Sequence, residues 1–188
     1  MGHHEGEHSR EGNGDAAHDG HHGHHASDVE SVGFGILTIS STRARHEDPT
    51  GDAMEAAVED AGKSVADRQV VTDEVDTIRA AVEAMVADDS VDVVVTSGGT
   101  GLTRDDVTLQ AVDPLFTRQI PGFGELFRLC SYEDIGPRAI LSRASAGLAD
   151  DVPVFCVPGS EAGATLGLEE LILPTAAHAV GLAQDERD

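Results

Sequence analysis

The sequence predicts an α/β protein in which a parallel sheet is covered by helices. The first observation is element order, because strand-like and helix-like segments alternate after about residue 30. The second is the stretch 91–108, where a valine-rich run leads into a glycine-rich loop and then a helix. The third is length, since 188 residues with a polar first segment leave enough chain for one core.

The first half of this body has the clearer pattern. We expect strand, helix, strand, helix and strand at residues 32–40, 50–61, 65–72, 73–88 and 91–95. Thr50 is the expected N-cap of the first helix, because its hydroxyl can satisfy free N–H groups at a helix start. Gly62 is the expected stop, because glycine accepts the left-handed conformation after a helix end. The second helix carries apolar residues at helical spacing.

The second half is less regular. We expect a helix at 124–131, strands at 139–149 and 152–157, and a final helix from Ser160 to about Gln184 with a break near Pro174. The stretch 157–160, Val-Pro-Gly-Ser, repeats the order strand end, glycine and hydroxyl of the central loop. Loops at the carboxyl ends of neighbouring parallel strands converge on one crevice, so both loops should face it.

Acidic residues dominate the charge of the chain. It has 12 Lys and Arg against 35 Asp and Glu, which gives a net charge of −23. Such a surface repels nucleic acids and anionic membranes, so neither is an expected partner. The excess of acid predicts a halophilic protein in a salt-rich cytosol, where ions screen its self-repulsion. An ordinary acidic protein is the alternative.

Cysteine usage and hydropathy predict a cytoplasmic location. Cys130 and Cys156 are the two cysteines, and neither belongs to a CxxC pattern, so we expect no disulfide framework. No uninterrupted apolar run reaches the roughly 18 residues that span a bilayer. Polar residues follow Met1, so we expect no signal peptide.

Residues 1–30 hold eight of the ten histidines and almost no apolar side chain. Such a segment cannot offset its ordering entropy, so we predict a disordered, acidic, His-rich tail ahead of a domain at 31–188. Closely spaced histidines chelate Ni, Cu or Zn, and the candidate ligands are His21, His22, His24 and His25. Two interpretations stay open: metal sequestration or delivery, and a solvated tail with incidental metal affinity.

The central loop is a candidate anion site. Residues 97–101, Ser-Gly-Gly-Thr-Gly, place backbone N–H groups between a strand end and a helix start, which suits a phosphate or a carboxylate. The adjacent Asp105 and Asp106 could hold a divalent metal or orient a nucleophile. The loop lacks the Gly-Lys-Ser/Thr of a Walker A motif, and Arg104 stands where GxGxxG needs glycine.

Five short motifs follow one another along the body. They are SGGTG at 97–101 with Asp-Val-Thr at 106–108, PGFGE at 121–125, SYE at 131–133, ILSRA at 140–144 and VPGS at 157–160. Together they resemble the signature of the molybdopterin-binding MoaB/MogA family of molybdenum cofactor biosynthesis proteins. Each motif alone is weak, whereas their order and spacing across about residues 32–182 make the resemblance specific.

The resemblance implies a three-layer α/β/α fold with a mostly parallel sheet, and a homo-oligomer that is a trimer or a hexamer. It also implies a nucleotidyltransferase whose substrates are molybdopterin and ATP, with Mg²⁺. The terminal phosphate of the pterin would attack the α-phosphate of ATP, which activates the pterin for insertion of molybdenum or tungsten. Such chemistry depends on placement and electrostatic stabilisation. Contacts with other proteins of the pathway are a further expectation.

The same resemblance assigns roles to single residues. Asp73, at the end of the second strand, and Asp106 would act as the catalytic pair that holds magnesium and positions ATP. Each has a structural alternative as the N-cap of the helix that follows it. The expected substrate-binding residues are Ser41, Ser97, Gly98, Gly99, Thr100, Gly101, Gly124, Glu125, Ser142, Arg143, Pro158, Gly159 and Ser160.

Some of these assignments have alternatives. Just after the first strand, family members often carry Asp or Asn before an arginine, whereas Ser40, Ser41 and Thr42 precede Arg43 here, so hydroxyls replace that contact. Glu125 could contact the pterin or favour a helix start through the helix dipole. Ser160 could bind phosphate, cap the last helix, or both. Arg143 or Arg104 would add charge-assisted hydrogen bonds, and Arg143 could instead form an ion pair between subunits. A protein that binds molybdopterin or delivers metal without adenylylation is the alternative function.

Overall fold

The computed structural model describes residues 1–2, 31–42 and 47–184. Apart from its first two residues, the predicted tail lies outside the described residues, and so do its candidate metal ligands His21, His22, His24 and His25. The predicted disorder and metal binding of the tail therefore stay predictions. The domain described below begins at residue 31.

The described residues begin with the predicted order of strand, helix, strand, helix and strand, and a two-residue strand at Arg118–Gln119 was not predicted. The strands are β1 (Gly33–Ile39), β2 (Ser64–Val71), β3 (Val93–Ser97), β4 (Arg118–Gln119), β5 (Ser145–Ala149) and β6 (Val152–Val157). The α-helices are α1 (Pro49–Asp60), α2 (Val75–Val86), α3 (Thr108–Val112), α4 (Pro121–Ile135), α5 (Glu161–Gly167) and α6 (Leu173–Gln184). Two 3₁₀ segments, η3 (Asp113–Leu115) and η4 (Gly136–Leu141), and one π-helical segment, η5 (Leu168–Ile172), complete the domain.

The strands form one sheet with the order β2-β1-β3-β6-β5-β4. β1 pairs in parallel with β2 and with β3, and β3 pairs in parallel with β6. β5 runs antiparallel to both β6 and β4. The prediction of a mostly parallel sheet is confirmed. The chain passes from β1 outward to β2 and then back across β1 to β3, so strand order reverses at the boundary between β1 and β3.

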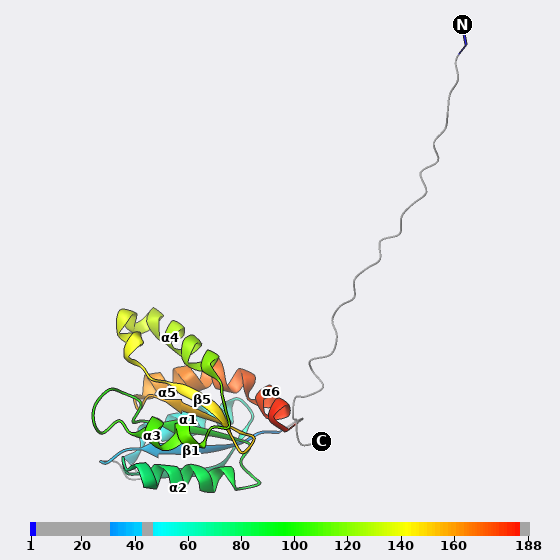
Figure 1. Cartoon of the computed structure of the whole chain (residues 1–188). Helices are drawn as coiled ribbons and strands as arrows, with labels where there is room; N and C mark the ends of the chain where they lie inside the picture. Colours follow the sequence, from blue (N-terminus) through cyan, green and yellow to red (C-terminus); the bar gives the residue numbers. More distant parts are fainter. Residues whose placement is uncertain (3–30, 43–46, 185–188) are drawn as a thin grey trace.

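Helices cover both faces of the sheet (Figure 1). On one face, α1, α4 and the helix formed by α5, η5 and α6 contribute core side chains such as Met54, Phe127 and Ile172. On the other face, α2 and α3 contribute side chains such as Ile78 and Val112. The valines of β3 are fully buried between these layers, as their unbroken apolar run predicts. The expected three-layer α/β/α fold is confirmed.

The stretch predicted as one strand at 139–149 is divided, and that prediction is wrong. Its first part belongs to η4, and only Ser145–Ala149 forms a strand. Gly136 ends α4 with a φ of 60°, and Pro137 follows at the start of η4, so the chain turns tightly here. The apolar Ile140 and Leu141, which suggested a strand, are 78% and 55% exposed.

The start of α1 also differs from its prediction. Asp48 is the N-cap, and its carboxylate accepts a hydrogen bond from the Gly51 N–H at 3.0 Å. Thr50 lies inside the first turn, where its Oγ1 donates to the Gly159 carbonyl at 3.3 Å. The assignment of Thr50 as N-cap is therefore wrong, because its hydroxyl bonds a distant loop instead. Gly62 ends this helix region with a φ of 71°, as predicted.

A buried arginine joins α1 to the sheet. The Arg68 side chain, on β2, is 4% exposed and pairs with Asp48 at 3.2 Å, with Asp52 at 2.6 Å, and with Glu55. Burial by itself would lower the pKa of Arg68, but hydrogen bonds to the three carboxylates outweigh this effect and raise it. Three acidic side chains thus share one cation, which fixes the first turns of α1 against β2.

The final helix is long, apolar and part of the core. Residues Glu161–Gln184 have the length and mean hydropathy, 1.2, of a membrane span. Leu168, Ile172 and Val180 of this helix pack into the core of the first face, which accounts for its apolar composition. The predicted break near Pro174 is a π-helical segment that ends just before it. A widened turn accommodates a proline ring that would otherwise clash with the preceding turn.

Both cysteines are free, in agreement with the prediction of no disulfide. Cys156 is fully buried on β6, and burial raises the pKa of its thiol to about 12. It is therefore a small apolar residue of the core and not a reactive thiolate.

Candidate functional site

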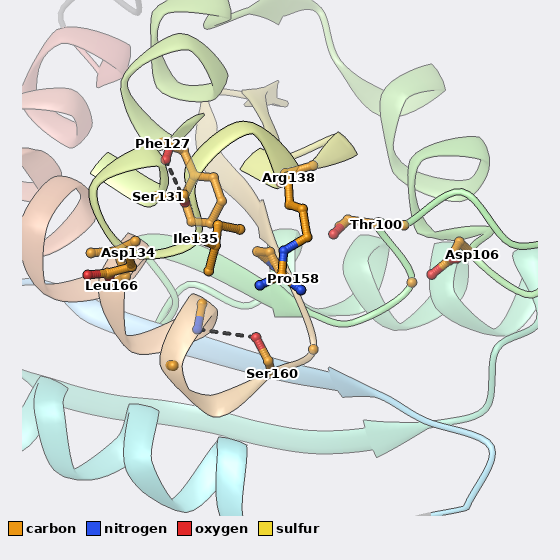
Figure 2. Close-up of a pocket in the computed structure, with 16 residues that line it drawn as sticks. Thr100, Asp106, Phe127, Ser131, Asp134, Ile135, Arg138, Pro158, Ser160 and Leu166 are labelled. Carbon is orange, nitrogen blue, oxygen red and sulfur yellow. Dashed lines mark hydrogen bonds between the residues drawn. The ribbon is translucent and has the colours of Figure 1, made fainter. Parts of the chain in front are cut away.

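A cavity of about 460 Å³ opens at the carboxyl ends of β3 and β6 (Figure 2). Residues of both predicted loops and of the approach to β5 line it together: Gly99, Thr100, Gly101, Asp106, Ser142, Pro158, Gly159 and Ser160. α4, η4 and α5 supply the remaining wall. The prediction that the two loops face one crevice is confirmed.

Direct hydrogen bonds hold the two loops against each other. The Ser97 hydroxyl donates to the Pro158 carbonyl at 3.1 Å, and the Gly98 N–H donates to the Val157 carbonyl at 3.1 Å. Ser97 is fully buried and does not line the cavity. Its hydroxyl therefore joins the loops, and its predicted contact with substrate stays a prediction.

Glycine is required where these loops approach each other and β1. Gly98 has a φ of 110°, and a Cβ there would lie 2.4 Å from the Ile39 carbonyl oxygen. Gly99 has a φ of 64°, and a Cβ there would lie 2.2 Å from Thr108 Oγ1. A Cβ on Gly159 would lie 3.0 Å from Gly98 Cα. A side chain at any of these positions would collide with β1, with Thr108 or with the other loop, so glycine lets the loops pack this closely.

Asp106 is fixed by its own loop. Its Oδ2 accepts hydrogen bonds from the Thr103 N–H at 2.7 Å and the Thr103 hydroxyl at 2.6 Å. Desolvation acts to raise the pKa of Asp106. The bonds from Thr103, a bond from the Gly101 N–H and the charge of Arg143 outweigh it, so the pKa is lowered. The N-cap of α3 is Val107, so the alternative of Asp106 as a helix cap is wrong.

Arg143 holds the central loop through hydrogen bonds and does not itself line the cavity. Its Nη2 donates to the Asp106 carbonyl at 2.8 Å, and its Nε donates to the Thr100 carbonyl at 3.3 Å. Because β5 is antiparallel to β6, the residues before β5 lie at the carboxyl end of β6. That reversal brings Ser142 into the cavity lining and Arg143 to the loop. The proposed phosphate contact of Arg143 stays a prediction, while its bonds show a role in holding Asp106.

Ser160 is both a helix cap and a cavity residue. Its Oγ accepts a hydrogen bond from the Gly163 N–H at 3.3 Å, so the prediction that it caps the last helix is confirmed (Figure 2). A hydroxyl that accepts one such bond still has its own hydrogen to donate. Ser160 can therefore donate to an anionic ligand while it caps the helix.

Asp73 and Ser41 lie at the same edge of the sheet but outside the cavity lining. The Ser41 hydroxyl donates to Asp73 Oδ2 at 2.5 Å. The N-cap of α2 is Glu74, so the alternative of Asp73 as a helix cap is wrong. Asp73 follows β2 and Asp106 follows β3, and β1 separates those strands. The predicted pairing of the two carboxylates on one magnesium stays a prediction.

Gly124 and Glu125 line a different hollow, of about 210 Å³, between α4 and β5. A Cβ on Gly124 would lie 2.5 Å from the Ala144 carbonyl oxygen, so glycine lets α4 approach the strand closely. Their predicted contacts with the pterin stay predictions. Arg104 is exposed on the loop and does not line the cavity.

One wall of the cavity consists of residues that the sequence did not predict as site residues. They are Phe127, Ser131, Asp134, Ile135 and Arg138, which lie on α4 and η4, and Figure 2 shows Arg138 directed toward Pro158 of the second loop. Phe123 anchors α4 by packing edge-on against Phe155 of β6, with ring centroids 5.1 Å apart. The spacing of the wall residues matches one face of a helix. That signal was hidden because the helix was predicted only for 124–131.

The donor set suits a phosphorylated ligand that carries its own metal. The cavity is lined by exposed backbone, by four side-chain hydroxyls (Thr100, Ser131, Ser142 and Ser160) and by two carboxylates (Asp106 and Asp134), while Phe127 and Leu166 give it apolar walls. Among the residues that the structure describes, no group of three or more His, Cys, Asp or Glu is placed to hold a metal ion. Magnesium bound to nucleotide phosphates needs only one or two protein carboxylates.

Comparison with known proteins agrees with this geometry. The family described as "probable molybdopterin binding domain" matches residues 35–178. Over 146 residues, the chain is 43% identical to molybdenum cofactor biosynthesis protein B of Bacillus subtilis, which covers 77% of this chain and 86% of that protein. The protein of the same name from Escherichia coli is 41% identical over 139 residues, with 74% and 82% covered.

Solved structures give the same result. A crystal structure of a molybdenum cofactor biosynthesis protein B has a TM-score of 0.80 and 41% identity, and covers 85% of this chain and 98% of that one. The tungsten cofactor synthesizing protein MoaB from Pyrococcus furiosus has a TM-score of 0.71 and 32% identity, with 82% and 98% covered. Sequence and fold together show that the chain belongs to the molybdopterin-binding MoaB/MogA family.

Proposed function

We propose that this protein adenylylates molybdopterin with Mg-ATP in the cytoplasm, as a step of molybdenum cofactor biosynthesis. The observation that carries the proposal is the joint lining of one cavity by both glycine loops and the ionised Asp106. The relatives are named for molybdenum cofactor biosynthesis, which supports the pathway. A volume of about 460 Å³ falls within the usual range of small-molecule sites.

In this reaction the chain acts by positioning its substrates. A phosphate oxygen of the pterin forms a bond to the α-phosphorus of ATP, and the bond from that phosphorus to the β-phosphate oxygen breaks, so pyrophosphate leaves. The backbone of Gly99–Gly101 and the hydroxyls of Thr100 and Ser160 orient phosphate oxygens. Apolar walls such as Phe127 exclude water that would otherwise compete with the pterin.

Magnesium enters this proposal as part of the ATP substrate. It prefers hard oxygen ligands, and Asp106 offers an ionised carboxylate at the cavity. Asp73 is the second carboxylate of the proposal, on the basis of the family resemblance. The bound ion supplies neutralisation of phosphate charge as pyrophosphate leaves.

The proposal is tested by a single-turnover assay with excess protein, molybdopterin and Mg-ATP in concentrated KCl. We expect adenylylated molybdopterin and pyrophosphate in equal amounts, and neither product when EDTA removes magnesium. Absence of product above the level of heat-denatured protein would reject the enzyme reading.

The competing proposal is a scaffold that binds molybdopterin without adenylylating it. The position of Asp73 outside the cavity lining is the observation that favours it. Equilibrium binding of molybdopterin with no product in the single-turnover assay would support the scaffold. Product formation at a rate that saturates with both substrates would exclude it.

The histidine tail gives a separate proposal. His21, His22, His24 and His25 have the spacing of a weak transition-metal chelator. We propose that any such binding is incidental to adenylylation. Deletion of residues 1–28 should leave the single-turnover rate unchanged while it removes Ni²⁺ or Zn²⁺ binding in a titration. A fall in rate on deletion would give the tail a role in delivery.

Self-association is also proposed, as a trimer or a hexamer. Support comes from an apolar surface on α4 and η4, where Leu126, Leu129, Tyr132, Ile140 and Leu141 are each more than half exposed. A large exposed apolar surface is typical of protein contacts. Light scattering coupled to gel filtration should give a mass of three or six chains of 19.6 kDa, and a monomer would contradict this.

A further inference from the structure

Arg138 is placed to meet a ligand in the cavity. It comes from η4, and Figure 2 shows its guanidinium end directed toward Pro158, with Thr100 and Ser160 nearby. It is the one cationic side chain among the residues that line the cavity. Cationic residues are scarce in this chain, with 12 Lys and Arg against 35 Asp and Glu. A cation in the cavity lining therefore indicates a role in binding.

The other arginines around the cavity are already engaged. Arg143 donates to two carbonyls of the central loop, and Arg128 donates to the Ser142 carbonyl at 3.4 Å. Arg138 makes no hydrogen bond or ion pair within the described part of the chain, not even with Asp134 one helical turn before it. Its five N–H donors therefore remain available.

The backbone around Arg138 is well anchored although the side chain is exposed. Gly136 takes a φ of 60° after α4, and Pro137 fixes the next φ. Ala139 follows Arg138 and is 2% exposed, so the segment is held to the domain on the far side of the arginine. The exposed guanidinium is thus carried by a backbone that is fixed to the domain.

The chemistry of the guanidinium indicates its ligand. Its planar fork pairs with two oxygens of a phosphoryl group, and such charge-assisted bonds are stronger than neutral ones. A protein of net charge −23 repels a polyanion, so local positive charge at the cavity offsets that repulsion where the ligand enters. The hydroxyls of Thr100 and Ser160 face the same space and would complete the contacts of a phosphoryl group.

We propose that Arg138 is a binding residue that recognises a phosphoryl group of the ligand in this cavity. The inference rests on the proposed function for the presence of phosphorylated ligands there. The same chemistry could come from ATP or from the phosphate of the pterin, and binding measurements with each separate the two sources.

The test is the affinity of Arg138→Gln and Arg138→Lys for four probes. These are Mg-ATP, adenosine, molybdopterin and the dephosphorylated pterin, each measured by calorimetry at one fixed KCl concentration. Arg138→Gln should weaken binding of one phosphorylated probe by about tenfold or more and leave its dephosphorylated counterpart unchanged. Arg138→Lys should recover part of the loss, because it keeps the charge but not the fork.

Arg79→Gln is the matched control for the loss of one charge. Arg79 lies on α2, on the opposite face of the sheet, and pairs with Asp76 at 3.4 Å (Figure 1). It should bind all four probes as the wild type does. Melting temperatures of the two Arg138 variants should equal that of the wild type, because the Arg138 side chain makes no contact that holds the fold.

The outcomes separate this inference from the proposed function. A wild-type protein that binds neither phosphorylated probe rejects both. A wild-type protein that binds them, with Arg138→Gln equal to Arg79→Gln, rejects the inference alone. An equal loss for adenosine and ATP also rejects it, because that pattern indicates a changed pocket and not phosphoryl recognition.

Discussion

Asp106 has a structural role in the central loop and a proposed catalytic role at the cavity. Its Oδ2 holds the turn that begins at Gly101, through the bonds from Thr103, and its carboxylate also lines the cavity. The neighbouring Asp105 is exposed and does not line the cavity. The Asp-Val-Thr motif distinguishes Asp106 from Asp105 in the sequence, and the structure adds a physical difference between them.

Asp106→Asn tests the proposed catalytic role. The amide keeps the size of the side chain but loses the charge that would hold magnesium, so we expect single-turnover adenylylation to fall by at least about tenfold. Asp105→Asn removes an equal charge one residue away and should retain the wild-type rate. Circular dichroism should show the same fold for all three proteins. Equal rates for the two variants would leave Asp106 with only its role in the loop.

The structural role of Asp106 should appear in the pH dependence of stability. The pKa of Asp106 is lowered in the folded protein, so its ionised form stabilises the fold above its unfolded pKa of about 3.9. That contribution is lost as pH falls through the lower, folded pKa. The stability advantage of wild type over Asp106→Asn should therefore be greatest near pH 6 and shrink toward pH 3. Urea midpoints at each pH measure this, and a constant difference would contradict it.

The role of some individual residues of the site could not be predicted from the sequence. Ser97, Gly98 and Arg143 look like ligand contacts in sequence, yet their atoms bond or approach other parts of the loops. Arg138 belongs to no motif, and its importance becomes visible only when α4 and η4 fold over the loops. Sequence patterns show which chemical groups are present, but not which of them the fold has already used.

At the scale of elements, the central segments were predicted best. α2 agrees with its prediction because its apolar residues recur at helical spacing over several turns, and the unbroken apolar run predicts β3, which lies two residues later than expected. The region between α4 and β5 was predicted poorly because a 3₁₀ segment and a short strand lack such periodicity. The reversed direction of β5 depends on pairing with β6 across a tight turn, which a list of elements does not reveal.

Gly98→Ala tests the packing of the central loop against β1. An added Cβ would meet the Ile39 carbonyl at 2.4 Å, at a residue that already has a φ of 110°. Gly62→Ala is the matched control, with a φ of 71° and open space around it. The control should lose about 1 kcal/mol in free energy of unfolding, and Gly98→Ala should lose at least about 1 kcal/mol more.

The same pair of variants separates stability from activity. A loop displaced by Gly98→Ala would move the backbone that is proposed to orient the phosphates, so adenylylation should fall at least about tenfold. Gly62→Ala lies beyond the end of α1 and should retain the wild-type rate. Denaturant midpoints and single-turnover rates on both proteins check the prediction. Equal losses of stability would show that the loop can shift to admit a methyl group.

At the scale of the molecule, the layers and the crevice followed from element order. Alternating strands and helices predicted a covered parallel sheet, and that sheet places the loops after β3 and β6 at one edge. Charge acts at this scale too, since 35 Asp and Glu outnumber 12 Lys and Arg. Arg68 illustrates the shortage, because it serves three carboxylates.

Salt should therefore stabilise the folded protein. A net charge of −23 repels itself in the compact state, and raising KCl from about 0.1 M to about 1 M shortens the screening length from about 10 Å to about 3 Å. We expect the melting temperature to rise steadily over this range. Chloride is the suitable anion, because sulfate would also strengthen apolar burial. An unchanged melting temperature would support the ordinary acidic protein instead.

The turn between β5 and β6 has a consequence for how the chain folds. Asp150 and Asp151 have φ values of 45° and 70°, the left-handed pair that joins two antiparallel strands most directly. This hairpin closes a very short loop, whereas β6 pairs with β3 across more than fifty residues. The hairpin can thus form early and offer the free edge of β6 as a template for β3. Completion of the cavity would then require the long-range pairing of β6 with β3, which brings the loops after these two strands together.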